Sequence, residues 1–193
     1  MGRPNRRFVP GVSLHTIHRG NNKCCIFVDD LDYEWYLEVL RRAAGHHGVR
    51  VHAFTLMTTH THLVVTPDSK TAMPCAMQEV GDRYVKYFNK KYSRIGRLWN
   101  NRYTAKSLED DLHALICHRY IEQNPVRAHM VKTPEEYRWS SYRVLALGKA
   151  CDWIVPHPAY EALGKTPEER QLAYREICAT PVPPTEFVRL RHR

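Results

Sequence analysis

The chain has 193 residues, of which 43% are hydrophobic and 25% are charged, as in an ordinary globular domain that can bury a core. No apolar run approaches the roughly 18 residues of a membrane span, and we recognise no export signal, so we expect a cytoplasmic protein without a membrane partner. The formal net charge of +9 favours a polyanionic partner such as nucleic acid, because binding there requires neutralisation of phosphates.

The hydrophobic pattern alternates between strand-like and helix-like segments along the first 124 residues. We expect strands at 11–18, 49–57, 60–66 and 102–107, and helices at 29–48, 71–92 and 109–124. Pro125 should end the last of these helices, because proline cannot continue a helical hydrogen-bond ladder. The order β-α-β-β-α-β-α predicts an α+β fold with a ferredoxin-like split βαβ core, an antiparallel sheet with helices packed on it.

The last part of the chain is irregular in pattern and rich in aromatic residues and proline. It holds one expected helix, at about 167–178. We therefore predict a main domain at 1–147, which includes a basic N-terminal arm, and a C-terminal extension at 148–193. The six cysteines are scattered without a Cys-x-x-Cys pair, which argues against a zinc ribbon and favours reduced thiols.

Residues 83–106 carry eight Lys or Arg residues and no Asp or Glu, with aromatic residues between them. Cations can follow a phosphate backbone, and exposed aromatics can stack on unpaired bases. The alternative is that the aromatics belong to the core, and we expect this for Tyr84 and Phe88. The basic side chains predicted to contact nucleic acid here are Lys90, Lys91, Arg94 and Arg97.

His60 and His62 lie two positions apart on the third expected strand, so their side chains share one face with Cα atoms roughly 6.6 Å apart. Two imidazoles placed in this way can form half of a divalent metal site, or can simply be two surface histidines. On the third helix, Tyr120 and Asn124 are one turn apart and Tyr120 should face the sheet. Spacing alone also allows a core-edge tyrosine and an asparagine that ends a helix.

The combination resembles the single-tyrosine HUH transposases, and among them the REP-associated tyrosine transposases, also called insertion-sequence-200-like. The matching segments span about residues 3–147, and they are His15–Asn21, His60–His62, Leu98–Tyr103, Arg119–Arg127 and Tyr137–Tyr142. The resemblance implies metal-dependent DNA strand transfer, with His60, His62 and Asn124 as ligands of Mg²⁺ or Mn²⁺ and Tyr120 as the nucleophile. It also implies a 5′-phosphotyrosine intermediate, which requires no nucleotide cofactor.

This sequence departs from the family pattern around the two histidines. Thr61 replaces a bulky apolar residue, and Thr58 and Thr59 replace a Pro-Asn pair. Thr61 should point to the opposite face of the sheet from the histidines, so we expect the change to affect packing more than coordination. A degraded element is the alternative.

The expected partner is single-stranded DNA that folds into a hairpin, and the C-terminal extension favours a monomer over a dimer. The remaining predicted DNA contacts are Arg3, Arg6 and Arg7 of the arm and Arg19, Arg102 and Arg127 of the domain. Arg127 can equally be a structural partner of Glu122 or Glu135. Two rival functions are a domesticated protein that binds DNA hairpins without cutting them, and an RNA-binding protein.

Overall fold

The computed structural model describes residues 8–183, so Arg3, Arg6 and Arg7 lie outside the described residues. Four strands form one antiparallel sheet in the order β2-β3-β1-β4. They are β1 (Leu14–Arg19), β2 (Val49–Met57), β3 (His60–Pro67) and β4 (Thr104–Ser107). This order is that of a split βαβ core, and it confirms the α+β prediction.

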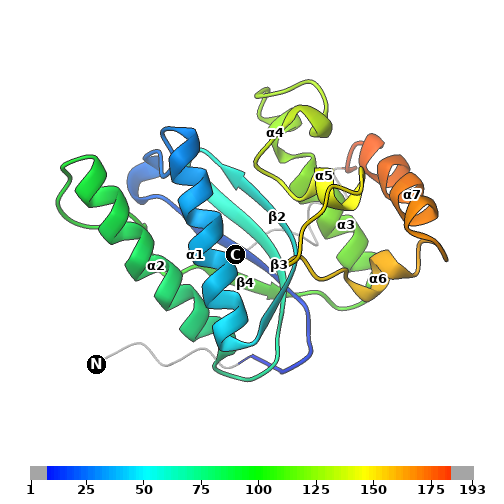
Figure 1. The fold of residues 1–193 in the computed structure, drawn as a ribbon, viewed down its shortest axis with the longest axis horizontal. Helices are drawn as coiled ribbons and strands as arrows, with labels where there is room; N and C mark the ends of the chain where they lie inside the picture. The colour runs from blue at the N-terminus through cyan, green and yellow to red at the C-terminus, as the bar shows by residue number, and fades with distance from the viewer. Residues whose placement is uncertain (1–7, 184–193) are drawn as a thin grey trace.

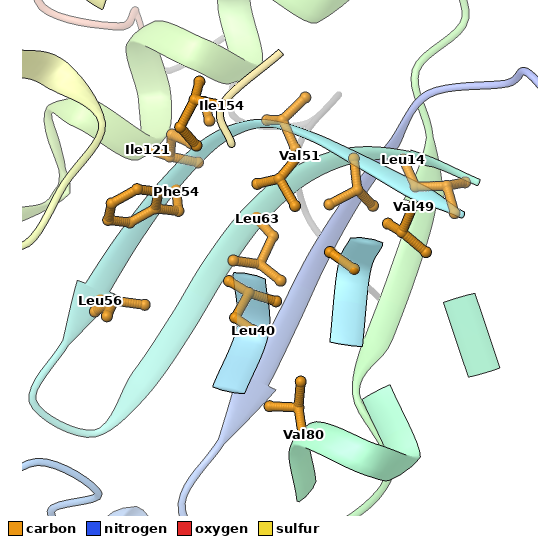
Figure 2. Close-up of a cluster of buried hydrophobic side chains, with 14 of the residues drawn as sticks. Leu14, Leu40, Val49, Val51, Phe54, Leu56, Leu63, Val80, Ile121 and Ile154 are labelled. Carbon is orange, nitrogen blue, oxygen red and sulfur yellow. The ribbon is translucent and has the colours of Figure 1, made fainter. Parts of the chain in front are cut away.

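Two long helices, α1 (Asp30–His47) and α2 (Ala72–Lys91), pack against each other over one face of the sheet, and α3 (Asp111–Glu122) packs over the other face (Figure 1). Figure 2 shows Leu40 of α1 next to Leu63 of β3, and Val80 of α2 belongs to the same buried cluster. The remaining described elements are short, apart from α7. They are η1 (Asn21–Lys23), α4 (Asn124–Arg127), η2 (Pro134–Glu136), α5 (Tyr142–Leu145), α6 (Pro158–Glu161) and α7 (Pro167–Ala179).

Local sequence explains where the long helices begin and end. Asp29 and Asp32 form a capping box at the start of α1, and Gly48 ends this helix with a left-handed backbone at φ +69°. Pro125 acts differently from the prediction, because α3 already ends at Glu122 and Pro125 lies in the first turn of a separate helix, α4. A proline is tolerated there because the first turn has no use for its missing N–H group.

The C-terminal part of the chain packs onto the core. Ile154 pairs with Val51 and Ser140 with Thr55 along the outer edge of β2, and α6 and α7 contact α3. Covering the edge of β2 removes a row of unpaired backbone groups that would otherwise invite association. The boundary at 147/148 stays a prediction.

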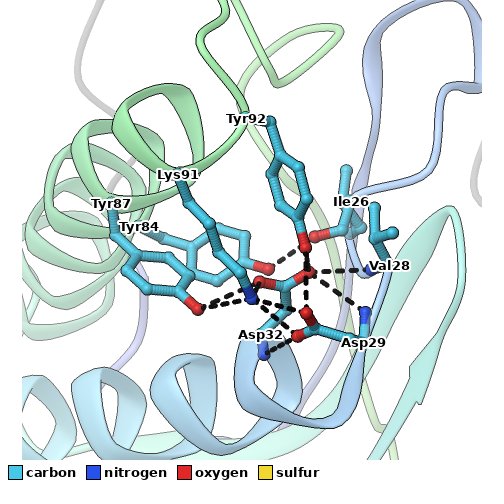
Figure 3. Close-up of polar contacts among 8 residues, drawn as sticks. All are labelled: Ile26, Val28, Asp29, Asp32, Tyr84, Tyr87, Lys91 and Tyr92. Atoms are coloured by element: carbon cyan, nitrogen blue, oxygen red, sulfur yellow. Dashed lines mark hydrogen bonds and ion pairs between the residues drawn. The ribbon is translucent and has the colours of Figure 1, made fainter.

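A polar cluster ties the start of α1 to the end of α2 (Figure 3). Lys91 Nζ lies 2.8 Å from Asp32 Oδ1 and 2.6 Å from Asp29 Oδ1, and the hydroxyls of Tyr87 and Tyr92 donate to Asp32. Burial by itself would raise the pKa of Asp32, but hydrogen bonds from Lys91, the Val28 amide and the two tyrosines lower it overall. Lys91, whose side chain is 23% exposed, is thus paired with two carboxylates of its own chain, and its contact with DNA stays a prediction.

Candidate catalytic site

Strand β3 presents His60 and His62 to the face of the sheet that α3 covers. In the register, His60 lies opposite Arg19 and His62 opposite Ile17, so these side chains share a face. Thr61 points the other way, where its Oγ1 lies 3.4 Å from the Tyr36 hydroxyl of α1. The threonine therefore belongs to the packing under α1, as the alternation of the strand predicts.

The two imidazole rings are close, with centroids 4.9 Å apart. His60 Nδ1 lies 3.1 Å from Thr59 Oγ1, and His62 Nδ1 lies 2.9 Å from His15 Nε2. Burial, together with the nearby Arg19 guanidinium, lowers the pKa of His60 to about 4. His60 is therefore a neutral imidazole at physiological pH, which is the form that binds metals.

Tyr120 of α3 lies against this group. Its ring meets His62 edge to face at 5.8 Å and His15 at 5.9 Å between centroids. The Arg127 guanidinium lies over the same tyrosine ring at 4.5 Å. The structure thus brings the predicted nucleophile next to one of the two predicted histidine ligands within a single chain.

Asn124 opens α4 and is 6% exposed. Its Oδ1 accepts a hydrogen bond of 2.9 Å from Arg127 Nη2, so Arg127 connects Asn124 to the Tyr120 ring. Glu122, which was one suggested partner of Arg127, instead accepts from the Ser141 hydroxyl at 2.5 Å.

His15 is a site residue that the sequence reasoning missed. It is 1% exposed on β1, and it contacts both His62 and Tyr120. The register places His15 opposite Val64, so His15 and His62 are diagonal neighbours on the same face. The signal was a histidine on the face of a half-buried strand, and it becomes informative only when β1 is known to pair with β3.

Arg19, another predicted DNA contact, lies opposite His60, whereas four further predicted contacts lie at or after the C-terminal end of α2. Lys90, Arg97 and Arg102 are exposed, and Arg94 packs over the Phe88 ring at 5.5 Å. The aromatic residues Tyr84, Phe88, Trp99 and Tyr103 are all buried, so they do not form an open stacking surface. For Tyr84 and Phe88 this confirms the prediction.

Residues 8–124 match the sequence profile of the family described as "Transposase IS200 like". The chain belongs to this family. It is therefore a transposase that acts on DNA, an enzyme class that cleaves DNA strands and transfers them. The matched segment contains β1, β3 and α3, and it therefore includes His15, His60, His62 and Tyr120.

The transposase is also similar to solved structures. One is titled "Structure of the REP associates tyrosine transposase bound to a REP hairpin", with 14% identity and a TM-score of 0.64 over 82% of this chain and 96% of that chain. Another is a putative transposase from Deinococcus radiodurans R1, with 22% identity and a TM-score of 0.44 over 63% of this chain and 97% of that chain. At these identities the first likeness establishes the fold. No curated protein matches the transposase. None of its described helices combines the length and the apolar character needed to cross a membrane.

Proposed function

We propose that this transposase binds single-stranded DNA that forms a hairpin, cleaves it through Tyr120 and rejoins strands, with a divalent metal ion, Mg²⁺ or Mn²⁺, held by His60, His62 and Asn124. The observation that carries the proposal is the contact of the Tyr120 ring with His62 and His15. A similar fold has been solved with a REP hairpin bound, which supports the choice of substrate.

The side chains fit a metal ion chemically. For Nε2 of His60 and His62 to bind a metal, Nδ1 of each ring must carry the proton and donate it to an acceptor. The Thr59 hydroxyl and His15 Nε2 are placed to accept these protons. Asn124 Oδ1 has a second lone pair beyond the bond from Arg127, so it can serve as an oxygen ligand. When bound, the ion polarises a phosphate oxygen as a Lewis acid.

The tyrosine supplies the covalent chemistry. Its hydroxyl oxygen forms a bond to phosphorus and the bond from phosphorus to the 3′ oxygen breaks, which leaves a 5′-phosphotyrosine and a 3′-hydroxyl. The Arg127 guanidinium over the ring of Tyr120 stabilises negative charge as it develops on the phenolic oxygen. Attack by a second 3′-hydroxyl on the phosphotyrosine reseals the strand and restores the tyrosine, so the cycle needs no nucleotide cofactor.

We also propose that the enzyme acts as a monomer. Tyr120 and His62 already meet within one chain, so no exchange of α3 between two copies is needed to complete the site. The exposed residues Arg19, Lys90, Arg97 and Arg102, together with Arg94 and Arg127, then remain as proposed contacts to the DNA backbone. Arg3, Arg6 and Arg7 keep this proposed role in the N-terminal arm.

The test incubates the protein with labelled hairpin oligonucleotides drawn from the flanks of its own gene, with Mn²⁺ or with EDTA. We expect a denaturant-resistant protein–DNA adduct that requires the metal and is absent in Tyr120→Phe. This variant keeps the ring and should retain hairpin affinity, which serves as the control. Tight binding without an adduct under any metal would favour the binding-only function instead, and a preference for RNA of equal sequence would favour the RNA-binding one.

A further inference from the structure

A cavity of about 560 Å³ lies between α2 and the segment at 96–103 that leads into β4. His18, Trp99 and Met77 contribute to its lining, and Lys86, Arg97 and Arg102 add three cations. His18 alternates with Arg19 along β1, so the cavity is on the face of the sheet that α1 and α2 cover, while Arg19 shares the face of His60. The cavity and His60 therefore lie on opposite faces of the sheet.

His18 and Trp99 carry polar atoms that the fold leaves unused. Their rings stack with centroids 3.9 Å apart, and the residues are only 6% and 9% exposed. His18 Nδ1 and Trp99 Nε1 both lack a hydrogen-bond partner among residues 8–183. Buried polar atoms in native proteins are normally paired, so these two unpaired nitrogens, on stacked rings at a cavity, are candidates to bind a ligand.

The chemistry of these two atoms is defined. His18 Nε2 lies 3.1 Å from the Asn101 carbonyl oxygen and must donate to it, and burial lowers the pKa of His18 to about 4, so the ring is neutral. Nδ1 is therefore a hydrogen-bond acceptor, whereas the indole N–H of Trp99 is only a donor. A donor and an acceptor beside stacked rings match the edge of a nucleobase, which presents both within one planar group.

Gly81 supports the view that this space is kept open. It lies in the interior of α2, where glycine is less favourable than alanine. A Cβ atom at this position would lie 3.8 Å from Trp99 Nε1, which is ordinary contact, so the fold itself does not exclude a side chain. Because Gly81 has no side chain, it adds no atoms next to Trp99 Nε1.

We propose that this cavity receives an unpaired nucleobase of the DNA substrate, with the phosphates on either side of that base held by Lys86, Arg97 and Arg102. The charge around the cavity supports a nucleic-acid occupant, since three cations are offset by Asp82 alone among the lining residues. The proposal rests on the proposed function in one respect, which is that hairpin DNA is the substrate. It assigns a base-binding site on the face of the sheet opposite to Tyr120.

The test fills the cavity with Gly81→Leu and compares it with Gly45→Leu, a change at an exposed position in the last turn of α1 where no atom lies within 4 Å of the added Cβ. Leucine favours a helix over glycine, so both variants should fold at least as stably as the parent, as thermal unfolding will show. Gly81→Ala adds the least bulk and replaces Gly81→Leu if that variant fails to fold. Dissociation constants are measured by fluorescence anisotropy on hairpins with one abasic site at each unpaired position in turn.

We expect one abasic position to weaken binding to the parent protein about 10-fold, the scale of one stacked base. Gly81→Leu should bind intact DNA more weakly than the parent by a similar factor, and the abasic site should not weaken its binding further. Gly45→Leu should have the same affinities as the parent. Equal affinity of Gly81→Leu and the parent for every hairpin would overturn the proposal. A loss in Gly81→Leu that is the same on intact and abasic DNA would overturn it as well.

The same oligonucleotides separate this inference from the proposed cleavage chemistry. Adduct formation is scored in parallel with Mn²⁺. The parent protein can form no adduct while one abasic position still abolishes the affinity difference between the parent and Gly81→Leu. In that case the Tyr120 chemistry is wrong and the cavity assignment stands. If the adduct forms and no abasic position changes the affinity difference between the parent and Gly81→Leu, the cavity assignment alone is wrong.

Discussion

The Asp32 cluster and the Tyr120 site are both polar groups built into the same sheet-and-helix core, but their hydrogen bonding differs. Both carboxylate oxygens of Asp32 have donors, Lys91 and Tyr87 for one and the Val28 amide and Tyr92 for the other (Figure 3). At the Tyr120 site, Asn124 Nδ2 is buried without a partner in the described part of the chain. A polar cluster whose groups are paired within its own chain stabilises the fold, whereas the unpaired amide nitrogen of Asn124 accords with the ligand proposed for the Tyr120 site.

The largest effect on stability is expected from a substitution in the Asp32 cluster. Lys91→Met leaves the carboxylate of Asp32, whose side chain is 0% exposed, without its cation and should cost roughly 3 kcal/mol in the free energy of unfolding. Urea denaturation measures this loss. The matched change Lys90→Met, at the exposed neighbouring residue, should alter stability by less than about 0.5 kcal/mol. A Lys91→Met protein that is as stable as the parent but binds hairpins more weakly would instead indicate that Lys91 contacts DNA.

A smaller effect is expected where His15 orients His62. His15→Ala removes the acceptor that we propose for His62 Nδ1–H, and losing such a partner typically costs about 10- to 100-fold in metal affinity or activity. His15→Gln, which restores an acceptor oxygen, should recover part of the loss. Mn²⁺ affinity by calorimetry and the rate of adduct formation are the measurements, with His129→Gln, at an exposed histidine, as the control. Unchanged Mn²⁺ affinity in His15→Ala would show that His15 has only a packing role.

The smallest effect on stability is expected when low pH protonates His52, a buried histidine whose two ring nitrogens both have hydrogen-bond partners. His52 Nδ1 lies 2.7 Å from the Val155 carbonyl oxygen and Nε2 lies 2.7 Å from Thr66 Oγ1, and burial lowers the pKa of His52 to about 4. Because the unfolded histidine has a pKa near 6.5, acidification protonates the unfolded chain first and the folded protein loses stability as the pH falls from 6.5 towards 4.

His52→Gln should therefore lose about 1 kcal/mol less than the parent between pH 7 and pH 5.5, as urea titrations at both values will show. The exposed residue His129 provides the control through His129→Gln. Parallel pH dependence in the parent and in His52→Gln would contradict the assignment.

The sequence located most of the fold because its signals are local. The strand at 49–57 was predicted at its observed bounds, and α1 ends at Gly48 as expected. The short helices α4, α5 and α6 were missed because each spans only four residues, too few to show a hydrophobic period. Pro125 was predicted to end α3, but a proline signals equally the first turn of a following helix.

The sequence by itself determined that His60 and His62 share a face and that Tyr120 and Asn124 are a turn apart, since both relations follow from the geometry of one strand and one helix. Only the tertiary structure decided what these residues meet. It placed His15 beside His62 and paired Lys91 with Asp32 across 59 residues of chain. It also left His18 Nδ1 and Trp99 Nε1, at a cavity, without a hydrogen-bond partner among the described residues. These contacts depend on which strands pair and which helix covers which face, and that choice is made by burying the whole core at once.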